Sequence, residues 1–202
     1  MADSPSANEL CVVALLMERP GHGWGLSETL DHHGEVGAIW SVARPLVYTS
    51  LRRLESDGYI KTSGIERGRR GPHRVNYAPT PKGRAAVKAW LQAPVEHVRD
   101  VRSLFLLKVV LAKRLGIDTE PLLVAQRALL APFVTWLEAR LDDVDPVAEP
   151  AEEAVLLFRL ATARTTIAFI DHVLDSRKAR AGGRRKAASA PSVKAASFLG
   201  LA

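Results

Sequence analysis

Residues 41–55 have the sequence SVARPLVYTSLRRLE and carry the most informative pattern in the chain. Val47, Leu51 and Leu54 recur at spacings of four and three, which is typical of the buried face of an α-helix. Pro45 suits the first turn of this helix, where its missing N–H costs nothing. The remaining faces carry side chains suited to base edges and phosphates, namely Arg44, Tyr48, Thr49 and Arg52. The pattern therefore predicts a helix that lies in a major groove.

A β-hairpin is predicted directly after this helix. Asp57 and Gly58 end the helix, and residues 59–63 and 74–77 alternate polar and apolar side chains over short strand-forming runs. Residues 66–73, ERGRRGPH, combine glycines for tight bends with arginines too closely spaced to be buried. Such a tip suits a phosphate backbone or a minor groove. A helix followed by a basic hairpin is the order found in a winged helix-turn-helix domain.

The candidate DNA contacts fall into three roles. They are base reading by Arg44, Thr49 and Arg52, phosphate contact by Tyr48 and Lys61, and wing contact by Arg67, Arg69, Arg70 and Arg74. Two plainer interpretations stay open, with the Tyr48 ring at the edge of the core and the hairpin as a merely solvated turn. Arg53 is excluded because Asp57, four residues later, favours a surface ion pair.

The charge is strongly polarised along the chain. The net charge is +6 overall, but residues 41–90 hold 11 bases against 3 acids and are +8. Residues 93–175 hold 9 bases against 13 acids and are −4. Positive charge is thus concentrated in the segment whose motifs predict DNA contact.

Two helices are predicted before the helix at 41–55. Residues 8–18 form the first, which ends at Pro20-Gly21, and residues 23–33 form the second, which ends at Gly34. The run Gly21-His22-Gly23-Trp24-Gly25 is not a dinucleotide loop, because no strand precedes it. We expect its histidine, and the pair at 32 and 33, to be surface or cap residues and not metal ligands.

Three helices are predicted in the second half of the chain. They span residues 101–115, residues 118 to about 144, and the segment after Glu149-Pro150. Pro132 should bend or divide the second helix. The spacing places these residues along one side of that helix: Leu122, Ala125, Leu129, Phe133, Trp136, Arg140 and Val144.

The third of these helices carries a heptad-like seam. Its apolar residues recur at alternating spacings of four and three: Leu156, Leu160, Ala163, Ile167, Ile170 and Leu174. An ordinary core face has the same spacing, so both interpretations remain open. A winged helix gains specificity when a two-fold dimer binds two half-sites, so we expect this seam to form a homodimer interface.

The C-terminal stretch 176–202 holds seven bases and no acids among Ala, Gly, Ser and Pro. This composition cannot bury a core and predicts a disordered basic tail, which adds nonspecific phosphate attraction or merely solubility. The expected domains are a winged helix-turn-helix domain at 1–93, a helical dimerisation and effector domain at 94–175, and the tail at 176–202. The fold class is mainly α with a small β-hairpin.

The composition excludes several other classes of protein. No apolar run approaches the roughly 20 residues that span a bilayer, and the acidic N-terminus differs from a basic signal region, so a cytoplasmic protein without membrane contact is expected. Cys11 lies among apolar residues and is expected to be a small buried side chain. No set of nucleophile, base and oxyanion donor can be assembled, so we expect neither an enzyme nor a cofactor.

The first half of the chain resembles the PadR transcriptional regulators. The similarity lies in the order and spacing of LL at 15–16, PGHGWGL at 20–26, VYTSLRRLESDGYI at 47–60, GPHR at 71–74 and YAPTPKGR at 77–84. The second half is similar in helical pattern, with residues 94–100 and 105–108 adding to the likeness. This chain departs from many relatives in having Pro45-Leu46 where they place small residues at the start of the recognition helix.

The resemblance implies a dimeric repressor that binds double-stranded DNA and is relieved by a small apolar or aromatic ligand. Candidate ligand-binding residues are Phe133, Trp136, Phe158 and Phe169, although aromatics at helical spacing also suit a core. The alternative is a DNA-coating or architectural protein that uses the hairpin and tail without reading bases.

Overall fold

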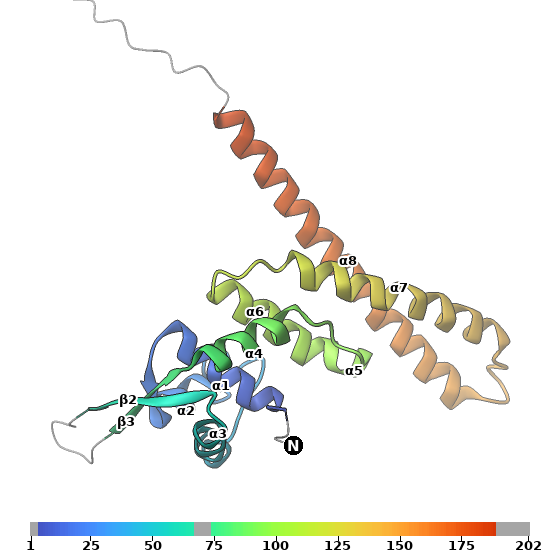
Figure 1. Ribbon diagram of the computed structural model, residues 1–202. Helices are drawn as coiled ribbons and strands as arrows, with labels where there is room; N and C mark the ends of the chain where they lie inside the picture. Colours follow the sequence, from blue (N-terminus) through green and yellow to red (C-terminus); the bar gives the residue numbers. More distant parts are fainter. Residues whose placement is uncertain (1–3, 67–73, 189–202) are drawn as a thin grey trace, which may run out of the picture.

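The computed structural model describes residues 4–66 and 74–188 (Figure 1). Its elements, in chain order, are α1 (Ala7–Glu18), β1 (Gly21–His22), α2 (Gly23–Thr29), α3 (Arg44–Ser56), β2 (Ile60–Glu66), β3 (Arg74–Pro79), α4 (Pro81–Gln92), α5 (Val98–Asp100), the π-helical turn η1 (Val101–Phe105), α6 (Leu106–Arg114), α7 (Glu120–Asp143) and α8 (Pro150–Ala188). Elements α1 to α4 form a winged helix-turn-helix, and α7 and α8 form a long helical hairpin beside it (Figure 1). The expected fold class is confirmed.

Helix α1 is the centre of the winged helix. A capping box starts it: the Ser6 hydroxyl accepts from the Glu9 N–H, and the Glu9 carboxylate accepts from the Ser6 N–H at 2.7 Å. Residues 9–16 are all buried, because α3 and α4 pack against different sides of this helix. Cys11 is fully buried there, and burial raises its thiol pKa to about 12, as expected for an inert side chain.

Helix α2 is shorter than its sequence predicts. It ends at Thr29 instead of near His33. The carbonyl oxygens of Thr29 and Leu30 accept from the N–H groups of Gly37 and Val42, at 3.1 and 3.0 Å, and not from the next turn of a helix. The chain bends here because Val36 is buried in the core, and a longer helix would carry it away.

The predicted hairpin is confirmed, and a short third strand joins it. Strands β2 and β3 pair antiparallel, and the sheet has the order β1-β3-β2 in the described residues. Strand β1 places Gly21 opposite Tyr77 and His22 opposite Asn76, a pairing that the sequence did not indicate. Gly58, at φ +74°, ends the turn between α3 and β2 as predicted.

The winged helix shares its core with the helical region. Leu107, Leu111 and Ala112 of α6 lie in the same buried cluster as the core of α1, α3 and α4. The expected boundary at residue 93 therefore does not separate two independent cores. The reason is that α6 packs back against α1 and α4 after the short connection at 93–97.

Helix α7 buries a different stripe from the one expected. Its buried residues are Leu122, Leu123, Gln126, Leu130 and Leu137. Leu122 belongs to both sets, but Trp136 of the expected stripe is exposed. The helix is apolar on several sides. Because one of its buried residues is a glutamine, the core face could not be identified from the apolar spacing. Pro132 lies inside α7 without dividing it.

Helix α8 continues past Asp175, where a disordered tail was expected to begin, and reaches Ala188. The extension is favoured because adding residues to an existing helix costs little, and Ala, Arg and Lys have high helix propensity. The rest of the expected tail lies outside the described residues.

By length and composition, one helix among the described residues, α7, is apolar enough to cross a membrane. The sequence led us to expect no segment long and apolar enough to span a bilayer, and by length and composition α7 is one. The same test is passed by helices that pack within a protein, and α7 carries three residues that form ion pairs with α8: Arg127, Glu138 and Arg140.

Candidate nucleic-acid interface

Helix α3 has the two faces that its sequence predicts. Val47, Leu51 and Leu54 are at most 1% exposed and face α1 and α2. The candidates on the other side are all exposed: Arg44, Tyr48, Thr49 and Arg52. Burial of the apolar face fixes the rotation of α3, and this leaves the polar face open to a ligand.

Two of the base-reading candidates are coupled to each other. The Thr49 hydroxyl donates to the Pro45 carbonyl oxygen at 3.0 Å, and the Arg52 Nη2 donates to the Thr49 Oγ1 at 3.2 Å. This arrangement holds the guanidinium along the exposed face and, among the described residues, engages it through Nη2. A guanidinium with free donors can make a bidentate contact to guanine.

The Tyr48 ring is held at the edge of the core while part of it remains open. A Cβ atom at Gly23 would lie 2.6 Å from the Tyr48 Cε1, so only glycine allows α2 to approach the ring this closely. Tyr48 is nevertheless 39% exposed. Tyr48 can therefore lie at the edge of the core and also contact a phosphate, because its ring packs against α2 without being covered.

The described part of the wing carries two of the candidate cations. Lys61 of β2 and Arg74 of β3 are exposed. The other wing candidates lie outside the described residues, namely Arg67, Arg69 and Arg70. Arg74 lies over the Trp24 ring, with its Cζ atom 5.0 Å from the ring centroid.

Sequence reasoning missed Trp24 and His22 as neighbours of this surface. The His22 Nδ1 accepts from the Gly25 N–H at 3.0 Å and caps α2, as expected for a cap histidine. The only available signal was the position of both residues in the glycine-rich run at 21–25, since the β1–β3 pairing that brings them to Arg74 is not local.

Arg53 has the structural role that the sequence predicts. Its Nε lies 3.7 Å from Asp57 and 3.6 Å from Glu9, so it connects α3 to α1. A side chain engaged in this way stabilises the placement of α3 and is not assigned to DNA.

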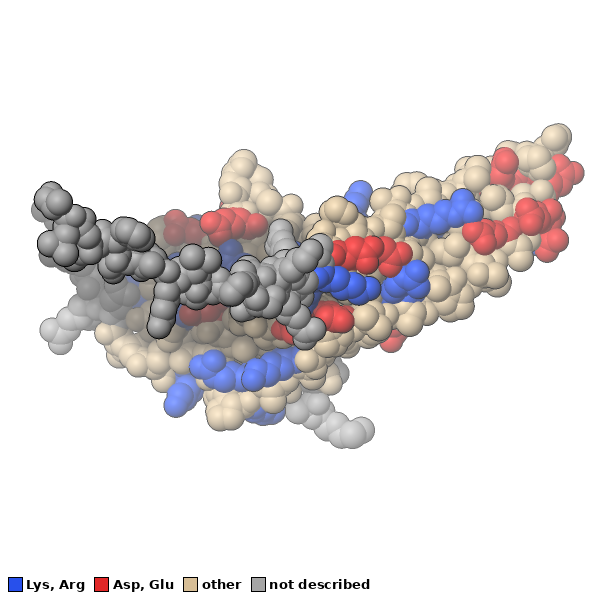
Figure 2. Space-filling view, turned by 90° about the horizontal axis from the view of Figure 1, so that it is seen from above, with Lys and Arg blue, Asp and Glu red and all other residues tan. Residues whose placement is uncertain are grey.

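One group of acidic residues lies at the end of the helical region that is away from the winged helix. Figure 2 shows red side chains at the end of the molecule formed by the α7–α8 connection. This segment contains Asp142, Asp143, Asp145, Glu149, Glu152 and Glu153. Because exposed charges are screened over about 10 Å at moderate salt, this acidic end does little to repel DNA bound at α3.

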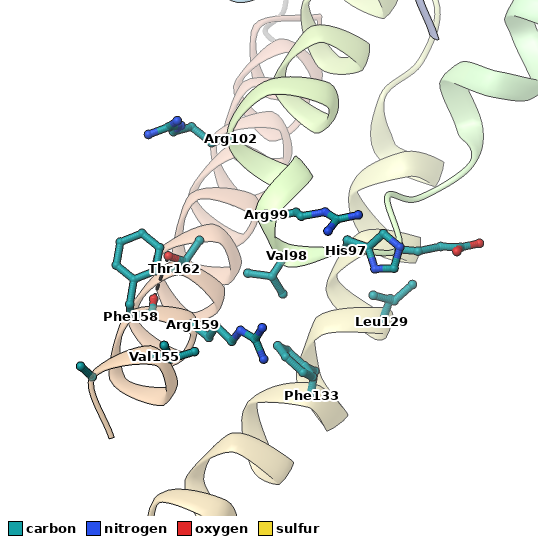
Figure 3. A pocket seen from close by; sticks show the side chains of 12 residues that line it. His97, Val98, Arg99, Arg102, Leu129, Phe133, Val155, Phe158, Arg159 and Thr162 are labelled. Carbon is teal, nitrogen blue, oxygen red and sulfur yellow. Dashed lines mark hydrogen bonds between the residues drawn. The ribbon is translucent and has the colours of Figure 1, made fainter. Parts of the chain in front are cut away.

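The helical region contains a pocket of about 890 Å³, between the α4–α5 connection, α7 and α8 (Figure 3). Two aromatic rings, Phe133 and Phe158, and three guanidinium groups, Arg99, Arg102 and Arg159, line it. In Figure 3, Arg159 points toward Phe133 and Arg102 points away from it. A cavity with aromatic walls and cations can accommodate a small aromatic or apolar molecule with a negative charge.

The structure brings together only half of the predicted ligand residues. Phe133 and Phe158 line the pocket. Trp136 stacks on Phe133, with ring centroids 5.7 Å apart, but is not part of the lining. Phe169 lies farther along α8, where its ring packs edge-on against Phe105, and it is also outside the lining.

Two buried polar side chains hold the connection between α4 and α5. Lys108 of α6 is 3% exposed, and its Nζ donates to the Ala93 carbonyl oxygen at 2.9 Å. Burial lowers the pKa of Lys108 to about 8. Gln126 of α7 is fully buried; its side chain accepts from the Val95 N–H at 2.7 Å and donates to the Val95 carbonyl oxygen at 3.0 Å. The next residues, 96–98, line the pocket.

Arg114, at the end of α6, forms a second connection to the winged helix. Its guanidinium donates twice to Glu18 of α1, at 2.7 and 2.8 Å, and once to Glu35, at 2.6 Å. These hydrogen bonds raise the pKa of Arg114 further above its ordinary value. The α2–α3 loop and α1 are thus both attached to α6.

The seam expected to form the dimer interface is mostly covered within the chain. Leu156 and Leu160 pack with Leu137 of α7, and Ile170 and Leu174 pack against the cluster around Phe105. Ala163 is also buried, and Ile167 is half-buried. Within the chain, α7 folds back along α8 and occupies that face, which is the core-face alternative that the spacing left open.

The comparisons with known proteins agree with the family resemblance. Residues 12–89 match the model of the Transcriptional regulator PadR-like family. Comparison with curated proteins found no match.

Three solved structures are similar to the chain. The structure of Bacillus subtilis PadR in complex with operator DNA is 17% identical and covers 86% of this chain and 99% of its own, with a TM-score of 0.44. A PadR-like transcriptional regulator from Bacillus cereus is 22% identical and covers 87% and 98%, with a TM-score of 0.39. A protein from Streptococcus mutans is 17% identical and covers 83% and 98%, also at 0.39. Residues 12–89, the winged-helix region, are thus similar to the PadR-like family of transcriptional regulators.

Proposed function

We propose that this chain is a cytoplasmic, sequence-specific repressor that binds double-stranded DNA through α3 and the β2–β3 wing. The observation that carries the proposal is the one-sided burial of α3, which leaves Arg44, Thr49 and Arg52 exposed on the polar side. Lys61 and Arg74 add exposed positive charge on the adjoining sheet. A helix for base edges beside a cationic wing for phosphates is what sequence-specific binding requires.

Selection of bound genomic fragments, followed by footprinting, tests this proposal. A repressor protects a short, roughly two-fold symmetric site, whereas a DNA-coating protein protects all fragments alike. Arg52→Ala should cost about 1–3 kcal/mol at its cognate base pair, and Lys61→Ala should weaken binding to every sequence equally. Equal weakening by Arg52→Ala would assign that residue to phosphate contact.

The repressor acts as a homodimer, in which a second copy packs on the exposed face of α8. This face is turned away from the buried seam and carries Leu157, Phe158 and Phe169, with Phe158 73% exposed. Ala161 and Ala168, also exposed, continue it at helical spacing. Exposed apolar side chains that follow one helix are suited to a coiled-coil contact with a second copy.

Light scattering of full-length variants tests the dimer. Phe158→Glu should convert the protein to a monomer, because it would place a charge in a desolvated contact. Val147→Glu is the matched control, since Val147 is an exposed valine in the α7–α8 connection, away from this face. A wild-type protein that is monomeric at micromolar concentration would exclude the dimer.

A small aromatic ligand with a negative charge relieves repression by binding in the pocket beside α8. Phe158 lines the pocket and also lies on the exposed face of α8, so a bound ligand can change the contact between the two copies. The pocket wall at residues 96–98 continues directly from the segment held by Lys108 and Gln126. A ligand induces release of DNA only if it binds the DNA-incompetent arrangement more tightly.

Thermal shift and DNA-binding measurements with aromatic carboxylic acids test ligand relief. An effective acid should raise the thermal midpoint and weaken binding to the selected DNA, and its uncharged amide should do neither. Arg159→Gln should reduce the response by removing a pocket cation, whereas Lys178→Gln, elsewhere on α8, should leave it intact. An identical response to acid and amide would exclude the charge recognition.

The basic C-terminal stretch adds nonspecific attraction to DNA phosphates. A test by truncation should retain Arg177, because its Nη1 donates to the Thr119 hydroxyl at 2.7 Å and its Nη2 pairs with Asp118. Truncation after Lys178 should weaken binding to random and selected DNA by similar factors and should reduce the salt dependence. A selective loss on the selected DNA would contradict this role.

A further inference from the structure

Trp24 is an exposed aromatic residue between the recognition helix and the wing. It lies in the first turn of α2 and is 41% exposed. The Arg74 Cζ lies 5.0 Å from its ring centroid, and the His22 ring centroid lies at 6.2 Å. The indole face therefore contacts a wing cation.

His22 closes the other side of this arrangement. Its Nδ1 accepts from the Gly25 N–H, so the neutral ring carries its proton on Nε2. The Arg74 Nη1 lies 3.4 Å from that Nε2 and gains no acceptor there. Packing against Trp24 and His22 restricts the guanidinium without using up its donors. Glu66 is opposite Arg74 in the β2–β3 ladder.

The same surface is continuous with α3. Tyr48 lies directly against Gly23, the residue before Trp24. Tyr48 and Trp24 are exposed to a similar extent, and Trp24, the residue after Gly23, lies beside Arg74 of β3. Side chains held by stacking lose less freedom when they bind, which favours contact with a phosphate backbone.

We infer that Trp24 is a positioning residue for DNA binding: its indole face holds Arg74 at the base of the wing in position for a backbone phosphate. The inference rests on the proposed DNA binding and extends it to a residue of α2. Because the attraction between a guanidinium and an exposed aromatic ring is modest, loss of the Trp24 ring should lower the affinity for DNA by about two- to fivefold.

Substitution of Trp24 by leucine or phenylalanine separates stacking from bulk. Trp24→Leu keeps an apolar side chain without a π face and should lower affinity for a random-sequence duplex by about two- to fivefold. Trp24→Phe keeps an aromatic face and should bind more tightly than the leucine variant. Val124→Ala, at an exposed apolar residue on α7 to which no role is assigned, is the control and should bind as wild type. Equal binding by Trp24→Leu and wild type would overturn the inference.

A double-substitution cycle distinguishes positioning from a separate contact. Arg74→Ala should weaken binding and reduce the salt slope by about one unit, as for one lost phosphate contact. If Trp24 acts through Arg74, Trp24→Leu should have no further effect in the Arg74→Ala background. Additive losses would overturn the inference. Failure of the wild-type protein to bind any duplex would instead exclude the proposed function, so the two failures are distinguishable.

Discussion

Replacement of Gln126 by leucine should strongly destabilise the protein, although the two side chains have similar size. Gln126 is fully buried and satisfies both the N–H and the carbonyl oxygen of Val95, at 2.7 and 3.0 Å. Leucine leaves both backbone groups buried without a partner, at about 1–3 kcal/mol each, and its greater apolarity offsets part of this cost. We expect a net loss of about 2–4 kcal/mol in the free energy of unfolding.

Urea denaturation followed by circular dichroism measures this loss. Gln92→Leu is the matched control, because Gln92 is an exposed glutamine at the end of α4 and should change stability by less than about 0.5 kcal/mol. Hydrogen exchange adds a local readout, since the Val95 amide should lose protection in Gln126→Leu. A loss below about 1 kcal/mol, or an equal loss in both variants, would refute the reasoning from the buried hydrogen bonds.

Three further predictions concern other contacts of the winged helix. Arg114→Met should lower stability by about 1 kcal/mol, less in high salt, because it removes the partly exposed pairs with Glu18 and Glu35; urea titrations at two ionic strengths measure this. Gly83→Ala should lower the thermal midpoint markedly, because a Cβ would lie 2.1 Å from the Tyr59 carbonyl oxygen; unchanged calorimetry would contradict this. Burial lowers the pKa of Lys108 from 10.5 to about 8. As the pH rises, the folded state therefore loses the Lys108 proton before the unfolded state does. The stability of wild type relative to Lys108→Met should therefore rise between about pH 8 and 10.5, and a constant difference would argue against this.

The site combines features that differ in how far the sequence revealed them. The exposed polar face of α3 follows from short-range periodicity, and the β2–β3 hairpin follows from its strand-forming runs and turn residues. The contact between Trp24 and Arg74 was not predictable in this way, because it depends on β1 pairing with β3 across more than fifty positions of the chain. The pocket is formed by segments far apart in the sequence, so only two of the four predicted aromatic residues line it.

The sequence by itself determined the local elements: the N-terminal caps of α1 and α4, the end of α3, the hairpin, and the polarity of α3. These depend on residues within one or two turns of each other, so their physical causes are contained in short stretches of sequence. The tertiary structure alone decided which stripe of α7 and α8 is buried, because both helices have more than one apolar side and the choice is made by their mutual packing. It also decided that a glutamine belongs in the core, since the Val95 backbone groups that it satisfies come from a distant segment.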